Sequence, residues 1–114
     1  MASLKSHHEG LMKRLANHEM AAEYLNIAIA EGDPKMFLVA LRDVAEAFGG
    51  VSKLAEKTGL NRVHLYRLMS KRGNPEITSM STVLAALGLR LTVDVVPAQR
   101  RRRSASGHSG RVNA

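Results

Sequence analysis

The chain of 114 residues contains no cysteine, no tryptophan, and only two tyrosines and two phenylalanines. The lack of cysteine excludes a disulfide-stapled scaffold, a cysteine nucleophile and a thiolate metal site. No apolar run approaches the roughly 20 residues that cross a membrane, and the first residues lack the basic-then-apolar order of a signal peptide. The few aromatic rings argue against a module that stacks the unpaired bases of single-stranded nucleic acid. We therefore expect one soluble intracellular domain.

Charge of both signs is present, but it is unevenly distributed around a formal net charge of +7. Residues 1–50 carry five basic against seven acidic side chains, whereas residues 51–76 carry six against two. Residues 77–96 are balanced, and residues 97–114 carry five arginines and no acid. Positive charge confined to one central segment and one tail favours a polyanion as partner. On charge alone, a basic chain without a nucleic-acid role stays an alternative.

Glycine and proline divide the chain into short segments with helical periodicity. Asp33 followed by Pro34 predicts a helix start, and Asn61 and Ser79 are further candidate N-caps. The predicted helices span residues 19–31, 34–48, 51–58, 61–70 and 79–87. The fold class is therefore predicted to be all-α, with five helices.

Apolar residues recur every three or four positions in the first two of these helices, which predicts that they face a core. In the first helix they are Met20, Tyr24 and Ile27, with Ala21, Leu25 and Ala28 alongside. In the second they are Phe37, Leu38, Leu41, Val44, Ala45 and Phe48. Met36, Met69 and Met80 are interpreted as core filler rather than as a binding stripe.

Residues 90–95 alternate polar and apolar side chains, which predicts one short β-strand after the helices. A lone strand has unpaired edges, so we expect it to pair with its own copy in a homodimer. Residues 97–114, with Arg100–Arg103, have too few apolar side chains to order themselves and are predicted to be a disordered tail. The predicted organisation is an N-terminal extension (1–18), a helical domain with its strand (19–96) and this tail.

The segment GVSKLAEKTGLNRVHLYRLMS has the residue types of a helix-turn-helix. Ala55 is a small residue where two helices would cross, and Gly59 tolerates the positive φ of the turn. Leu65 and Leu68 are aliphatic residues at the spacing expected for the buried side of the second helix. The alternative is an ordinary antiparallel helix pair whose arginines are merely solvated.

The opposite side of the second helix carries side chains suited to a major groove. At 100° per residue, Val63 and Arg67 point away from Leu65, and Asn61 and Arg62 occupy the exposed N-terminal end. Arginine can pair with guanine, asparagine with adenine, and valine can contact a thymine methyl, so these four are the candidate base contacts. The candidate phosphate contacts are Ser52, Lys53, Lys57, Lys71 and Arg72, together with His64, which could instead face solvent.

The segment resembles the helix-turn-helix of phage repressors (Cro/cI-like, XRE-type). A longer stretch is similar to the addiction-module antidote proteins of bacterial type II toxin–antitoxin systems. The matching strings are AAEYLNIAIAEGD (21–33), FLVALRDVAEAFGG (37–50), SKLAEKTGLNR (52–62), LYRLMSKRGNP (65–75) and LAALGLRLTV (84–93). The repressor motif places its base contacts on the same four residues, although Val51 stands where many repressors have a polar phosphate contact.

The resemblance implies a cytoplasmic bacterial antitoxin that binds and neutralises a small RelE-like toxin encoded beside it. It also implies a homodimer that represses its own operon by binding double-stranded DNA. A stand-alone helix-turn-helix regulator without a toxin partner is the second hypothesis. The acidic balance of residues 1–50 makes that half the predicted toxin-binding region.

Catalytic and cofactor chemistry find little support in the sequence. His7-His8-Glu9 could suggest a metal site, but adjacent helical residues do not face one another, so a solvated pair is the preferred interpretation. The sequence contains no recognisable arrangement of a nucleophile, a general base and a group that orients the base. The acidic pairs Glu19/Glu23 and Asp43/Glu46 are interpreted as solvated. We predict no enzyme activity, no metal and no cofactor.

Overall fold

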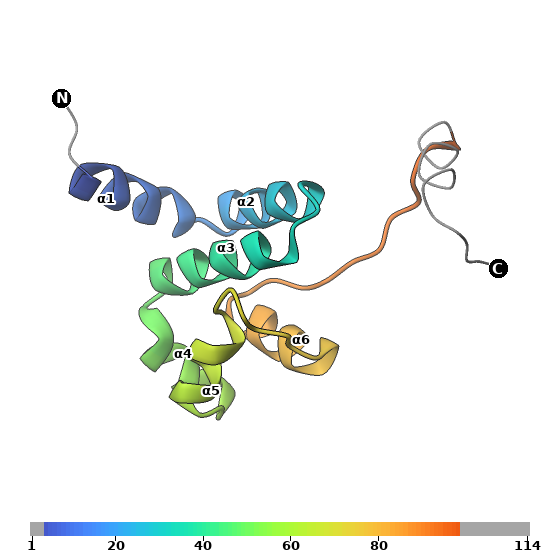
Figure 1. The fold of residues 1–114 in the computed structure, drawn as a ribbon. Coiled ribbons are helices and arrows are strands. Elements are labelled where there is room, and N and C mark those ends of the chain that lie inside the picture. The colour runs from blue at the N-terminus through green and yellow to red at the C-terminus, as the bar shows by residue number, and fades with distance from the viewer. Residues whose placement is uncertain (1–3, 99–114) are drawn as a thin grey trace.

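The computed structural model describes residues 4–98, and within them it contains six helices and no strand (Figure 1). The helices are α1 (Leu4–Leu15), α2 (His18–Ala30), α3 (Pro34–Ala47), α4 (Gly50–Thr58), α5 (Arg62–Leu68) and α6 (Ile77–Ala86). The all-α class is confirmed, but the predicted number of five helices is wrong.

The additional helix, α1, lies in the region predicted to be an extension. Leu11 and Met12 are partly buried and Leu15 is only 2% exposed, so α1 packs its apolar side on α2 and α3. His8 Nε2 lies 2.8 Å from Glu46 Oε2 of α3. Both side chains stay 51% exposed, so they remain solvated as predicted and in addition contact each other. The interpretation of Asp43 as solvated is wrong, because Asp43 is half-buried and accepts a hydrogen bond from the Tyr24 hydroxyl at 2.8 Å. Helix α1 was not predicted from the sequence, because this segment is mostly polar and only one narrow side of it is apolar.

Two predicted helix starts are confirmed by their caps. The Asp33 side chain accepts a hydrogen bond from the Lys35 N–H at 3.0 Å, and Pro34 occupies the first turn of α3. Asn61 caps α5. Ser79 is not the cap of α6, because the helix already begins at Ile77, where the Met80 N–H donates to the Glu76 carbonyl at 2.9 Å.

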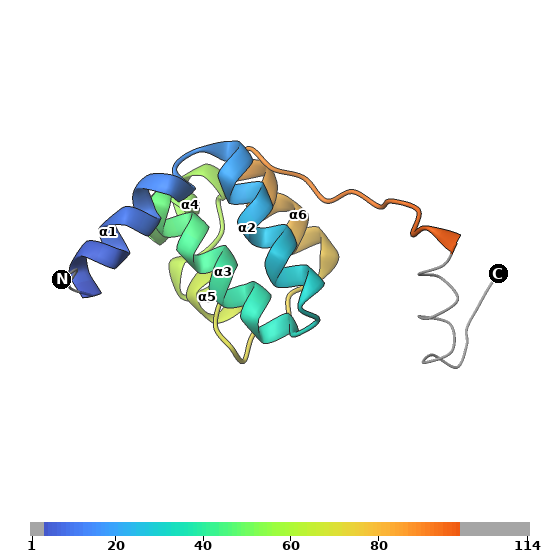
Figure 2. The same cartoon turned by 90° about the horizontal axis from the view of Figure 1, so that it is seen from above.

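The core is formed around α3, which lies between α2 on one side and the α4–α5 pair on the other (Figures 1 and 2). Its largest fully buried side chains are Leu41, Leu65, Met69, Val44 and Val83, contributed by α3, the α5 region and α6. Helix α6 packs against α4 and closes the core. The fold thereby presents α2 and α5 on different sides of the molecule.

The chain leaves α6 through Gly88, whose φ of +78° is left-handed, and the Leu89 N–H donates to the Leu84 carbonyl at 2.8 Å. The segment predicted to be a strand first passes along the helices as far as Thr92 and then runs away from them, and it does not form a strand (Figure 1). A strand needs a neighbour for its backbone hydrogen bonds, and residues 4–98 of a single copy offer none. Val93 is 98% exposed and Val95 is 81% exposed. Residues 99–114 of the predicted disordered tail, with Arg100–Arg103, lie outside the described residues.

Candidate nucleic-acid interface

The connection between α4 and α5 is a tight turn held by local hydrogen bonds. Gly59 has a φ of +74°, and its N–H donates to the Ala55 carbonyl at 2.9 Å. The Thr58 hydroxyl donates to the Leu54 carbonyl at 2.8 Å and accepts from the Leu60 N–H at 3.1 Å. Glycine is needed here because a left-handed φ strains a residue that has a Cβ atom. The turn therefore sets the direction in which α5 leaves α4.

The inner side of this helix pair is apolar, as predicted. Leu65 is fully buried, and Leu68 is 4% exposed. Ala55 is partly buried against the core. Val51 is 7% exposed, which explains the apolar residue at the opening of the motif: this side chain packs inward and could not reach a phosphate.

The outer side of α5 presents the predicted base contacts to solvent. Arg62 and Arg67 are exposed, and Val63 has 64% of its surface exposed. Asn61 is exposed as well, but its Oδ1 accepts from the Val63 N–H at 2.8 Å and from the His64 N–H at 3.2 Å. The cap thus occupies the side-chain oxygen, whereas no hydrogen bond within residues 4–98 engages the amide NH₂. Of its two functional groups, only the NH₂ is offered outward.

The predicted phosphate contacts surround this surface. Ser52, Lys53 and Lys57 on α4 are exposed, as are Lys71 and Arg72 after α5. A hollow beside α5 is formed by residues of α5, of the turn that follows it and of the start of α6. The residues that line it are His64, Arg67, Leu68, Arg72, Gly73, Asn74, Pro75, Glu76 and Ser79. His64 therefore lies beside two arginines, a place that the sequence did not assign to it. We call the exposed side of α4 and α5 with Lys71 and Arg72 the basic face.

One contact beside the basic face joins residues that are distant in the sequence. The Arg42 guanidinium carbon of α3 lies 5.5 Å from the centre of the Tyr66 ring of α5. A cation at this distance from an aromatic face is attracted by the ring electrons. The contact brings α3 and one more positive charge next to α5. Sequence periodicity could not find it, because the spacing of residues within a helix says nothing about its neighbours.

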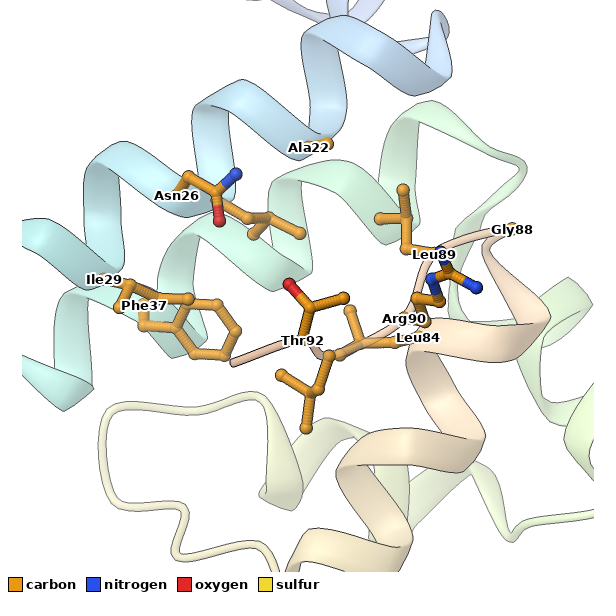
Figure 3. Close-up of a pocket in the computed structure, with 11 residues that line it drawn as sticks. Ala22, Asn26, Ile29, Phe37, Leu84, Gly88, Leu89, Arg90 and Thr92 are labelled. Carbon is orange, nitrogen blue, oxygen red and sulfur yellow. The ribbon is translucent and has the colours of Figure 1, made fainter. Parts of the chain in front are cut away.

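A second hollow lies where the C-terminal segment leaves the helices. It is lined by α2, α3 and α6 side chains together with the start of that segment: Ala22, Leu25, Asn26, Ile29, Phe37, Leu84, Gly88, Leu89, Arg90, Leu91 and Thr92 (Figure 3). Because Leu91 and Thr92 already lie along this hollow, the segment starts as part of the domain surface before it departs. We call it the C-terminal hollow.

Other sites find no geometry in the part of the chain that the structure describes. Within residues 4–98, no three histidine or acidic side chains gather closely enough to hold a metal ion. In the same range, no helix has both the length and the hydropathy to cross a membrane. Met69 and Met80 are core residues as predicted, whereas Met36 is 47% exposed and the prediction for it is wrong.

These residues define a small all-α protein that exposes a basic helix on a tightly joined helix pair. A family model described as "probable addiction module antidote protein" matches residues 7–95, and the chain belongs to this family. An uncharacterised protein of Haemophilus influenzae is 33% identical over 81 residues, which are 71% of this chain and 82% of that protein. No solved structure matches the chain significantly. An antidote implies a toxin as its partner, and the family is typically non-enzymatic.

Proposed function

We propose that the chain is the antitoxin of a type II toxin–antitoxin module, that it neutralises a small RelE-like toxin by direct binding, and that it represses its own operon. In this proposal α4 and α5 are a helix-turn-helix, and α5 enters the major groove of double-stranded DNA. The observation that carries the DNA-binding part is the basic face. One short helix buries Leu65 and Leu68 completely or nearly so, while it turns Arg62, Val63 and Arg67 to solvent.

The residues of the basic face divide into two roles. Arg62, Val63 and Arg67 are the proposed base contacts, since two arginines and a valine match guanine edges and a thymine methyl. The remaining basic side chains and His64 contact phosphates, which position the protein without reading sequence. Asn61 stays a proposed base contact, but only as an NH₂ donor. A bidentate pair with adenine would need the Oδ1 that the α5 cap already occupies.

The operator-binding form is proposed to be a homodimer. Two copies related by a two-fold axis would place their α5 helices in successive major grooves, with half-sites about 34–36 Å apart. The exposed valines after Leu91 support the pairing of residues 90–95 with the same residues of a second copy, because pairing would satisfy their backbone groups. A stand-alone regulator without a toxin would share this DNA-binding form. The antidote family favours the antitoxin over it.

A gel-shift titration on the DNA upstream of this chain's own gene, at two salt concentrations and with random DNA as competitor, tests the DNA-binding part. We expect Arg67→Ala to lose preference at one base position per half-site, by roughly 1–3 kcal/mol. Lys53→Ala should weaken binding to all sequences alike and reduce the salt dependence. Arg14→Ala removes a positive charge from α1, which is not part of the basic face, and serves as the matched control.

Equal losses on specific and random DNA for both Arg67→Ala and Lys53→Ala would contradict direct base readout. Binding by the wild type that random DNA removes completely would contradict operator recognition. In that case the toxin-neutralising role would stand alone, and co-purification with the product of the adjoining open reading frame would test it.

A further inference from the structure

An apolar stripe that the sequence assigns to the core lies outside it. Ala21 and Leu25 of α2 are buried, but Met20 is 41% exposed and Ile27 is 56% exposed. Tyr24 lies between them at helical spacing and is half-buried. Helix α2 therefore buries one side and offers a second apolar side that nothing in the described chain covers.

This second side continues onto α3 and forms a groove. It is lined by Tyr24, Ile27 and Ala28 of α2, by Glu31 directly after α2, and by Met36, Val39 and Ala40 of α3, and we call it the α2–α3 groove. Met36 contributes a flexible side chain that is 47% exposed. The Tyr24 hydroxyl donates to Asp43 Oδ2 of α3 at 2.8 Å, which ties the two walls together. A contiguous apolar groove with fixed walls is typical of a protein-binding surface, unlike apolar residues scattered singly.

The charge around the groove indicates the kind of occupant. Its lining contains Glu31 and no basic side chain. Glu19 and Glu23 are exposed on α2, and the stretch from residue 18 to residue 36 carries four acidic side chains against one basic side chain, Lys35. This net negative charge disfavours DNA as the occupant, because DNA has the same sign of charge. A second copy is disfavoured, since a two-fold contact would set this acidic rim against itself.

We propose that the α2–α3 groove is the toxin-binding surface of this antitoxin, and that it receives an apolar side chain flanked by lysine or arginine on the toxin. This inference rests on the proposed function for the existence of the toxin, and adds the surface that binds it. Helix α3 lies between α2 and α5 (Figures 1 and 2), and the groove lies on the α2 side of it. One copy can therefore hold the toxin and DNA at the same time.

The test uses the full-length chain and, as the probe, the protein product of the open reading frame that adjoins its gene. The probe is co-expressed with the chain, recovered from the complex and titrated against each variant. Ile27→Glu and Met36→Glu each place a charge in the groove and should weaken binding by about thirtyfold or more. Glu31→Lys should weaken toxin binding most at low salt, because the new positive charge repels a basic partner that Glu31 attracts.

Two control variants match these changes. Ile29→Glu alters a residue of the same helix that is 50% exposed but lines the C-terminal hollow instead, and should leave affinity within about threefold. Glu9→Lys reverses a charge on α1 and should likewise change little. Operator binding by Ile27→Glu and Met36→Glu should equal that of the wild type, which shows that both variants are folded.

The outcomes separate the surface from the function. Wild-type binding that Ile27→Glu and Met36→Glu leave unchanged would overturn the assignment of the groove and leave the antitoxin function standing. Failure of the wild type to bind the probe would overturn both. A change in the sedimentation mass of Ile27→Glu alone, without the probe, would show that the groove joins two copies and would also overturn the assignment.

Discussion

At the scale of single residues, Tyr24 is the one side chain among residues 4–98 whose pKa is clearly shifted. Burial first, and then the hydrogen bond to Asp43, raise the pKa of Tyr24 from the ordinary 10.0 to about 12. Both causes favour the neutral phenol. An unfolded tyrosine loses its proton near pH 10, whereas the folded one holds it until about pH 12. The stabilisation is therefore complete below pH 10 and is lost as the pH rises to 12.

We expect the tyrosinate absorbance of a Tyr66→Phe variant, in which Tyr24 is the only tyrosine, to rise with a midpoint near pH 12. Adding Asp43→Asn should lower this midpoint, because it removes the negative charge that opposes deprotonation. A midpoint near pH 10 without the second substitution would show that the Tyr24–Asp43 contact does not exist in solution. The same pair holds the α2–α3 groove together, so toxin affinity should also fall in Asp43→Asn.

Two glycines should respond oppositely to alanine. A Cβ atom at Gly73 would collide with the Leu68 carbonyl and lie 2.9 Å from the Arg67 carbonyl oxygen, and both are backbone atoms. Gly73→Ala should therefore cost about 1–3 kcal/mol and disturb the turn after α5. At Gly10, inside α1, the nearest atom is the end of the Arg14 side chain at 3.8 Å. Gly10→Ala should stabilise by about 0.5–1 kcal/mol, since glycine is costly within a helix.

Urea denaturation of both glycine variants beside the wild type measures these effects. The urea concentration at the midpoint of unfolding should be lowest for Gly73→Ala, higher for the wild type and highest for Gly10→Ala. A Gly73→Ala variant as stable as the wild type would contradict the close approach of this turn to the end of α5. Stabilisation by Gly10→Ala would support α1 as a helix of the folded protein, because a polar disordered extension would show no gain.

At the scale of elements, α5 depends on its first residue in two ways that can be separated. Asn61→Ala removes the cap and should cost about 1 kcal/mol. Asn61→Ser keeps a cap oxygen but loses the amide NH₂, so stability should stay within a few tenths of a kcal/mol while base preference falls. Asp33→Ala, which removes the cap of α3, is the control: it should lower stability without altering base preference. Denaturation and gel shift on the same preparations measure both effects.

If Asn61→Ser binds the operator with unchanged preference, Asn61 is a cap and nothing more. The proposed base contacts would then reduce to Arg62, Val63 and Arg67. The elements themselves were largely predictable, since α2 to α5 begin and end within two residues of the predicted bounds. Their starts depend on local features such as Asp33-Pro34 and the glycine of the turn. Helix α1 was missed because its docking, rather than its own polar sequence, accounts for it.

At the scale of the whole molecule, the segment after Leu89 is the proposed dimer contact. Truncation after Leu89 should give a monomer, because it removes the only proposed strand and with it the exposed valines. The truncated monomer should still bind a single half-site. Its affinity for the whole operator should fall, because it lacks the gain that the dimer obtains from binding two linked half-sites. Sedimentation and gel shift measure both. A truncated chain that stays dimeric would contradict strand pairing and point to another surface.

The surfaces proposed for the two partners, DNA and the toxin, come from different halves of the chain. The basic face belongs to the segment of residues 51–76, with a charge of +4, and the α2–α3 groove belongs to the first half, with a charge of −2. This division was visible in the sequence, because charge is a property of composition. Which side chains of each half gather on one surface was not visible. Ile27 and Met36 come from different helices, as do Arg42 and Tyr66, and only packing brings each pair together.

The sequence by itself determined the helices α2 to α5, the caps Asp33 and Asn61, the turn at Gly59 and the exposed side of α5. These follow from interactions between residues a few positions apart, which a linear pattern records. The tertiary structure alone decided that α1 docks, that the Met20 and Ile27 side of α2 stays outside, and that residues 90–95 pair with no other described segment of the same chain. An apolar stripe can face a core or a partner with the same spacing, and only the positions of the other helices determine which.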